Sequence, residues 1–169
     1  MSGKHIVFAL LLTLGGLVLQ TTLFGESRIE PFGAAPNVVL LLVVICAAYL
    51  EPEPAMLVAF TSGLLTDLLG GSVIGLWAIS MVVVAYVTLR VRHRIDDGVI
   101  VVAAGLLGLS VLGQAIFAIA GTLFGQQIFA DPGWYRQIVL PSLYNVVLAA
   151  LLIPLVSRIM GGRQVRRLV

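Results

Sequence analysis

The chain has 169 residues, of which 60% are hydrophobic and 11% are charged, and its mean hydropathy is +1.10. Soluble domains carry about 25% charged residues, so this composition excludes a soluble globular protein and indicates an integral membrane protein. The net charge of +2, with basic residues placed beside apolar segments, does not indicate nucleic-acid binding, and the single cysteine, Cys46, excludes an intramolecular disulfide.

Six segments of the chain are apolar and are predicted to be helices, because about 20 helical residues cross the hydrocarbon core of a bilayer. In chain order they are residues 5–24, 35–50, 55–69, 73–89, 99–124 and 137–156. Only Glu51-Pro52-Glu53-Pro54 separates the second from the third, so these two could instead form one long span or a re-entrant hairpin. Two prolines and two acids are disfavoured in hydrocarbon, which favours a turn at the membrane surface.

The basic residues predict the orientation of these segments. With six spans and a cytoplasmic N-terminus, eight of the ten Lys and Arg residues lie on the cytoplasmic side and only Arg28 and Arg136 lie outside. An excess of basic residues in cytoplasmic segments favours this topology. We therefore expect an all-α, polytopic membrane protein: one transmembrane domain, residues 1–169, forming a six-helix bundle with both termini cytoplasmic.

Three arginines follow the fourth segment on the cytoplasmic side. They are Arg90, Arg92 and Arg94. Basic residues next to a membrane are attracted to anionic lipid headgroups by about 1 kcal/mol each. We expect this cluster to contact such lipids or a protein partner.

The third segment contains Asp67, the one acidic residue within the predicted spans. Ala55, Ala59 and Gly63 precede it at intervals of four residues, so all four share a helix face. Small residues on one face let helix backbones approach closely in a membrane. Asp67 is therefore expected to point toward protein.

The turn after the third segment continues the same spacing. Gly71 and Gly75 are expected to permit a tight connection, and Ser72 is predicted to be the N-cap of the fourth segment. Asp67 could accept hydrogen bonds from the amides that begin the fourth segment, or pair with Arg28 or Arg136. It could instead belong to a polar site that binds a ligand or a partner, since ionisable residues at membrane depth are functional candidates.

Gly121 and Gly125, at the end of the fifth segment, have the spacing of closely packed membrane helices. This contact could lie within the bundle or with a helix of another protein. The spans contain no pair of acids and no nucleophile with a neighbouring base, so the sequence indicates neither an enzyme nor a cofactor or metal site.

The stretch AFTSGLLTDLLGGSVIGLWAISMVVVAYV, residues 59–87, resembles the signature of the bacterial MreD family of rod shape-determining proteins. The residues that match the pattern are Gly63, Leu64, Leu65, Asp67, Leu68, Leu69 and Gly75. The resemblance implies a non-enzymatic subunit of the cell-elongation (peptidoglycan synthesis) machinery in the bacterial cytoplasmic membrane. It implies association with MreC and, through MreC, with the cell-wall transpeptidase and glycosyltransferase and the MreB filament.

The resemblance also has a consequence for the fold. The family is similar in fold to the six-helix membrane subunits of energy-coupling-factor vitamin transporters. The alternative function is therefore that of a substrate-binding subunit in such a transporter, which would need a polar pocket that opens to the outside.

Overall fold

The computed structural model describes residues 3–23, 34–92, 98–130 and 132–160, and in these ranges its regular structure is helical throughout. Each predicted segment forms one helix. The helices are α1 (Gly3–Leu23), α2 (Val38–Tyr49), α3 (Pro52–Gly70), α4 (Leu76–Val91), α5 (Val99–Leu123) and α6 (Trp134–Met160), with a short 3-10 helix η3 (Ile128–Ala130) before α6.

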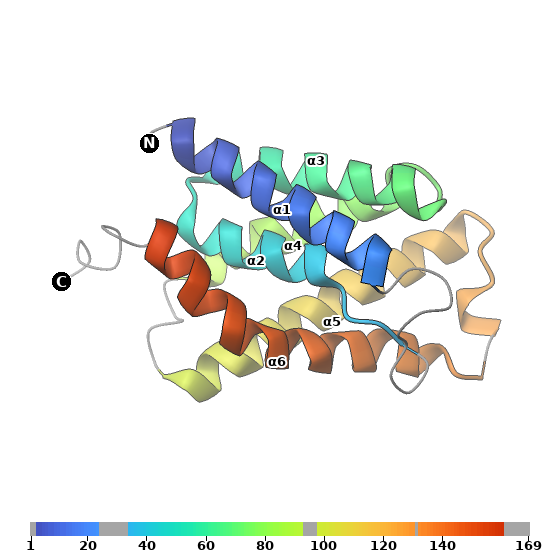
Figure 1. Ribbon diagram of the computed structural model, residues 1–169. Coiled ribbons are helices and arrows are strands. Elements are labelled where there is room, and N and C mark those ends of the chain that lie inside the picture. Colours follow the sequence, from blue (N-terminus) through green and yellow to red (C-terminus); the bar gives the residue numbers. More distant parts are fainter. Residues whose placement is uncertain (1–2, 24–33, 93–97, 131, 161–169) are drawn as a thin grey trace.

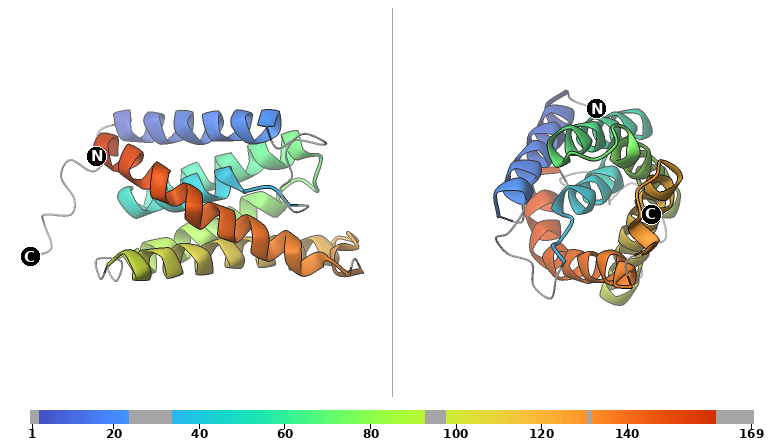
Figure 2. Two further views of the ribbon diagram at one scale, coloured as in Figure 1. Left: turned by 60° about the horizontal axis from the view of Figure 1, so that its bottom comes forward. Right: turned by 90° about the vertical axis from the view of Figure 1, so that its right-hand side faces the viewer.

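The helix α2 lies at the centre of the bundle and contacts the other five helices (Figure 1, Figure 2). Every side chain from Val38 to Ala47 is buried. A helix that is surrounded by protein needs no polar face, which explains why α2 is apolar all round.

Side chains from two other helices contact the ends of α2. At its start, the Gln20 side-chain Oε1 in α1 accepts a hydrogen bond of 3.1 Å from the Val39 N–H. At its end, the Arg92 Nη1 donates to the carbonyl oxygen of Leu50 at 2.6 Å. These bonds satisfy polar groups that a helix leaves unpaired at its termini.

Within the described residues, three helices are long and apolar enough to cross a membrane, namely α1, α5 and α6, whereas the apolar helices α2 and α4 are shorter. The outward face of α6 consists of exposed aliphatic side chains at intervals of four residues. They are Val139, Leu143, Val147, Leu151, Leu155 and Ile159. A continuous aliphatic stripe of this kind is suited to contact with lipid chains.

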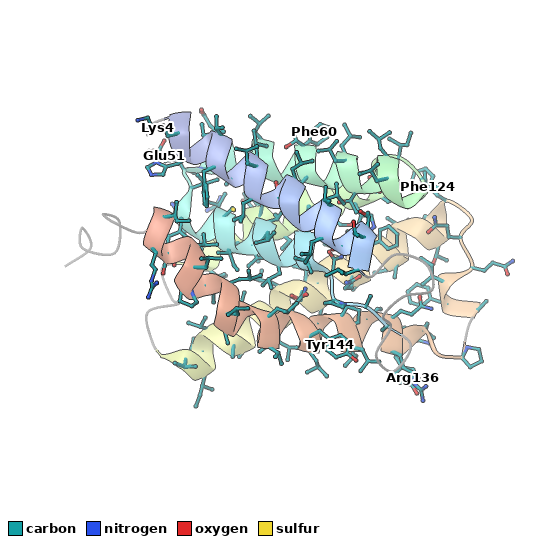
Figure 3. The ribbon with its side chains drawn as sticks, in the orientation of Figure 1. Lys4, Glu51, Phe60, Phe124, Arg136 and Tyr144 are labelled. Carbon is teal, nitrogen blue, oxygen red and sulfur yellow. The ribbon has the colours of Figure 1, made fainter. Side chains whose placement is uncertain are left out.

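The two ends of the bundle differ in charge. Lys4 and Glu51 lie at one end, and Phe124 and Arg136 lie at the other (Figure 3). The described Lys and Arg residues at the first end are Lys4, Arg90, Arg92 and Arg158, whereas Arg136 is at the second. The first is called the basic end below, and both the start of α1 and the end of α6 lie there (Figure 1).

Candidate functional site

The carboxylate of Asp67 lies in the last turn of α3 and is 1% exposed. The Ser72 hydroxyl donates to its Oδ1 at 2.7 Å, and the Gly75 N–H donates to its Oδ2 at 2.8 Å. The Trp77 N–H lies 3.1 Å from both carboxylate oxygens, and the Ala78 N–H donates to Oδ2 at 3.3 Å. The prediction that Asp67 binds the amides at the start of the fourth segment is confirmed.

This arrangement compensates the burial of a charge. The first N–H groups of a helix have no partner within the helix, and the macrodipole makes that terminus positive. Asp67 places a negative charge there, although it belongs to a different helix. Its described contacts all lie in α4 and in the turn before it.

The alternative partners of Asp67 are placed differently. The Arg136 guanidinium lies over the Tyr135 ring, 5.9 Å from its centroid. Arg28 lies outside the described residues.

The prediction that Ser72 is the N-cap of the fourth segment is wrong. The helix α4 begins at Leu76, its N-cap is Gly75, and the Ser72 hydroxyl binds Asp67 instead. Gly71, which ends α3, has a φ of 65°, and Gly75 has a φ of 103°. Both values lie in the left-handed region that favours glycine, so these two glycines make the tight connection possible.

The small-residue face of α3 packs inside the bundle against α4. Ala55, Ala59, Gly63 and Asp67 are all buried. A Cβ atom on Gly63 would lie 2.5 Å from the Ala78 Cα and 2.6 Å from the Trp77 carbonyl oxygen. The two backbones therefore touch at Gly63, just below the Asp67 carboxylate.

The same turn is connected to α5 through an aromatic pair. The Trp77 ring stacks on Phe117, with 4.2 Å between the ring centroids and 16° between the planes. Sequence reasoning missed this contact, because no spacing rule relates positions 40 residues apart.

Gly121 and Gly125 form the end of α5. Gly125 has a φ of 87°, and the Gln126 N–H donates to the Gly121 carbonyl oxygen at 2.9 Å. A Cβ on Gly121 would lie 2.5 Å from the Gln126 Oε1 and 2.8 Å from the Ile128 Cδ1. The close contact at Gly121 is thus with the chain that follows the helix, in a glycine-dependent reversal.

The arginine cluster at the basic end is divided. Arg92 binds the end of α2, where a positive charge is favourable. Arg90 is exposed, donates to the Tyr86 hydroxyl at 2.8 Å and lies over the Tyr86 ring. Arg94 lies outside the described residues.

Sequence reasoning also missed a groove of about 300 Å³ between α1 and α3. Its lining residues are Val7, Leu10, Leu11, Thr13, Leu14, Thr61, Ser62 and Leu65. Thr13 and Thr61 donate to carbonyl oxygens of their own helices. The Ser62 hydroxyl, on a residue only 3% exposed, has no hydrogen-bond partner among the described residues. The sequence signal that could have indicated this groove is the presence of Thr13, Thr61 and Ser62 in otherwise apolar segments.

Over the described ranges, no three acidic, histidine or cysteine side chains come together as metal ligands would.

Comparison with known proteins identifies a protein family that matches this chain. Residues 3–161 match the family described as rod shape-determining protein MreD. Neither a curated protein nor a solved structure matches the chain. The family match runs from the start of α1 to just past the end of α6 and includes the Asp67 turn. This apolar helical chain is therefore a membrane protein related to cell shape, and it belongs to the MreD family of rod shape-determining proteins.

Proposed function

We propose that this protein is a non-enzymatic subunit of the cell-elongation complex in the bacterial cytoplasmic membrane, where it binds MreC and helps to control cell shape. Through MreC it associates with the cell-wall transpeptidase, the glycosyltransferase and the MreB filament. The family match over residues 3–161 is the observation that carries this proposal.

In the proposed topology all six helices span the membrane within a single domain, residues 1–169, and both termini are cytoplasmic. Successive helices run in opposite directions, so α1 begins and α6 ends at the same end of the bundle (Figure 1). Four of the five described Lys and Arg residues lie at that end, which supports its cytoplasmic placement.

The groove between α1 and α3 is the proposed contact surface for MreC. The small-residue face of α3 is buried, with α4 against it at Gly63, and the outward face of α6 is aliphatic from Val139 to Ile159. The groove differs because its lining includes Ser62, whose hydroxyl is buried and lacks a partner among the described residues. Lipid chains offer no hydrogen-bonding group at this depth, whereas side chains of a membrane helix do.

Site-specific photo-crosslinking in living cells tests this proposal. A photoreactive residue at Leu11, in the groove, should crosslink to MreC, whereas one at Leu151, on the aliphatic face of α6, should not. These positions are 62% and 70% exposed, so both are accessible to a neighbour. Equal crosslinking from both positions, or none from Leu11, would contradict docking in the groove.

Affinity purification from native membranes tests the function itself. Recovery of MreC with the cell-wall synthases is the expected result. Recovery of a paired ATPase module and a vitamin would replace the proposal with the transporter alternative.

A further inference from the structure

A second cavity, of about 230 Å³, lies between the central helix α2 and the helices α4, α5 and α6. Its walls are aliphatic apart from Tyr49 and Thr88. The Thr88 hydroxyl already donates to the Val84 carbonyl oxygen at 2.8 Å, so it is satisfied within its own helix. A wall of this composition accepts a hydrocarbon chain rather than a polar molecule.

The size of the cavity agrees with that occupant. Pockets for small organic ligands typically hold about 300–1,000 Å³, so this cavity is small for a vitamin-sized molecule. It has room for part of one acyl chain.

Exposure along the cavity shows where it opens. Val44 and Leu109, toward the middle of the bundle, are buried, whereas Tyr49 and Val102, toward the basic end, are half-buried. The helices α5 and α6 also diverge toward that end (Figure 1, Figure 2). The cavity therefore opens near the basic end, where the lipid headgroups of the cytoplasmic leaflet would lie.

Arg92 supplies a positive charge at that opening. It follows Thr88 by four residues, so the two share a face of α4. Its Nη1 binds the carbonyl oxygen of Leu50, the residue next to Tyr49 in the lining. A guanidinium has five N–H donors in a planar fork, so one bond to Leu50 leaves donors for a phosphate.

We propose that this cavity is a binding site for an anionic phospholipid, with an acyl chain between α2 and α5 and the phosphate on Arg92. The positive charge of Arg92 suits the phosphate of such a lipid, and the apolar wall of the cavity suits its acyl chain. A zwitterionic lipid lacks the net negative charge that makes the arginine contact favourable.

The test uses the full-length protein in detergent, with its thermal stability and lipid retention measured against added phosphatidylglycerol or phosphatidylcholine of the same acyl chains. Phosphatidylglycerol should bind at least about tenfold more tightly, as expected for a charge-assisted contact. Ala48→Leu, which adds carbon atoms to the cavity wall, and Arg92→Gln should each weaken this binding about tenfold.

Arg90→Gln is the matched control, because it removes the same charge from an exposed side chain of the same helix. It should leave phosphatidylglycerol binding unchanged, and Arg92→Lys should retain part of it. Ala48→Leu does not touch the Leu50 contact, so it remains informative if Arg92→Gln unfolds. Equal losses in Arg90→Gln and Arg92→Gln, wild-type binding by Ala48→Leu, or equal binding of both lipids would overturn the proposal. The proposal would also be overturned if a protein copurified with the wild type and was lost from Ala48→Leu, because the cavity would then hold a protein helix rather than a lipid.

Discussion

The Asp67 carboxylate and the backbone N–H of Trp77 lie 3.1 Å apart, so the last turn of α3 provides the cap for the first turn of α4. Four donors converge on this one side chain, three of them from the backbone. The close contact at Gly63 and the stack of Trp77 on Phe117 fix the same turn from two further sides. The stretch that resembles the family signature, residues 59–87, therefore contains the contacts that hold α3, α4 and α5 together.

Asp67→Ala should destabilise the bundle by about 3 kcal/mol, because it leaves several buried donors without an acceptor. Asp67→Asn should be milder, since one amide oxygen can still accept some of these bonds. Unfolding in detergent and rescue of rod shape in cells that lack the protein are the measurements. If both variants behave as wild type, Asp67 has no structural role; if they fail equally, the charge matters more than the hydrogen bonds.

Gly63→Ala should lower the stability by about 3 kcal/mol, because the new Cβ would meet the backbone of α4, which cannot move aside easily. Gly105→Ala is the control: it also adds a Cβ within a helix, but outside the backbone of its own helix turn no described atom lies within 4 Å of that Cβ. Thermal unfolding of the two variants side by side checks the difference. Similar melting temperatures would show that the packing of α3 on α4 is looser than described.

Gly75→Ala should cost about 1–3 kcal/mol, since a φ of 103° is strained for any residue with a side chain. The effect should be less than additive with Asp67→Ala, because both changes disrupt the same cap. A double-mutant cycle measured by unfolding decides this. Full additivity would mean that the turn and the carboxylate act independently.

The double substitution Asn145→Leu with Ser110→Ala should leave stability unchanged or raise it, in contrast to the loss expected for Asp67→Ala. Asn145 is fully buried in α6, its Nδ2 makes only a 3.4 Å bond to Ser110, and its Oδ1 has no partner among the described residues. Replacing both partners of a buried hydrogen bond by apolar groups of similar shape can be neutral or stabilising, because no polar group is then left unpaired. A drop of more than about 1 kcal/mol would indicate a partner that binds this amide.

Hydropathy was sufficient to predict the helices. The segment predicted at 99–124 is the helix Val99–Leu123, and the one at 73–89 is Leu76–Val91. Helices that face lipid are apolar and end where polar residues begin, so the composition of the sequence indicates where each helix begins and ends. The apolar composition of α2 also agrees with its central place, because a helix that five others surround needs no polar face.

The candidate site was predictable only in part. The spacing from Ala55 to Asp67 indicated a buried face, and the aspartate at its end indicated a polar contact. Asp67 was one predicted acceptor for the amides of α4, but the N-cap position was assigned to Ser72. Capping rules consider the residues next to a helix, whereas Asp67 lies nine residues before Leu76. The groove at Ser62 and the cavity between α2 and α5 depend on how helices meet, which no local pattern specifies.

The central position of α2 has a consequence for biogenesis. This 12-residue helix is about 18 Å long, which is shorter than the roughly 30 Å hydrocarbon core that its segment crosses in the proposed topology. Two of its covering helices, α5 and α6, are the last to leave the ribosome. A nascent chain that stops before α5 exposes the side of this apolar helix that α5 and α6 would cover, so membrane proteases should recognise truncated forms and spare only the finished chain.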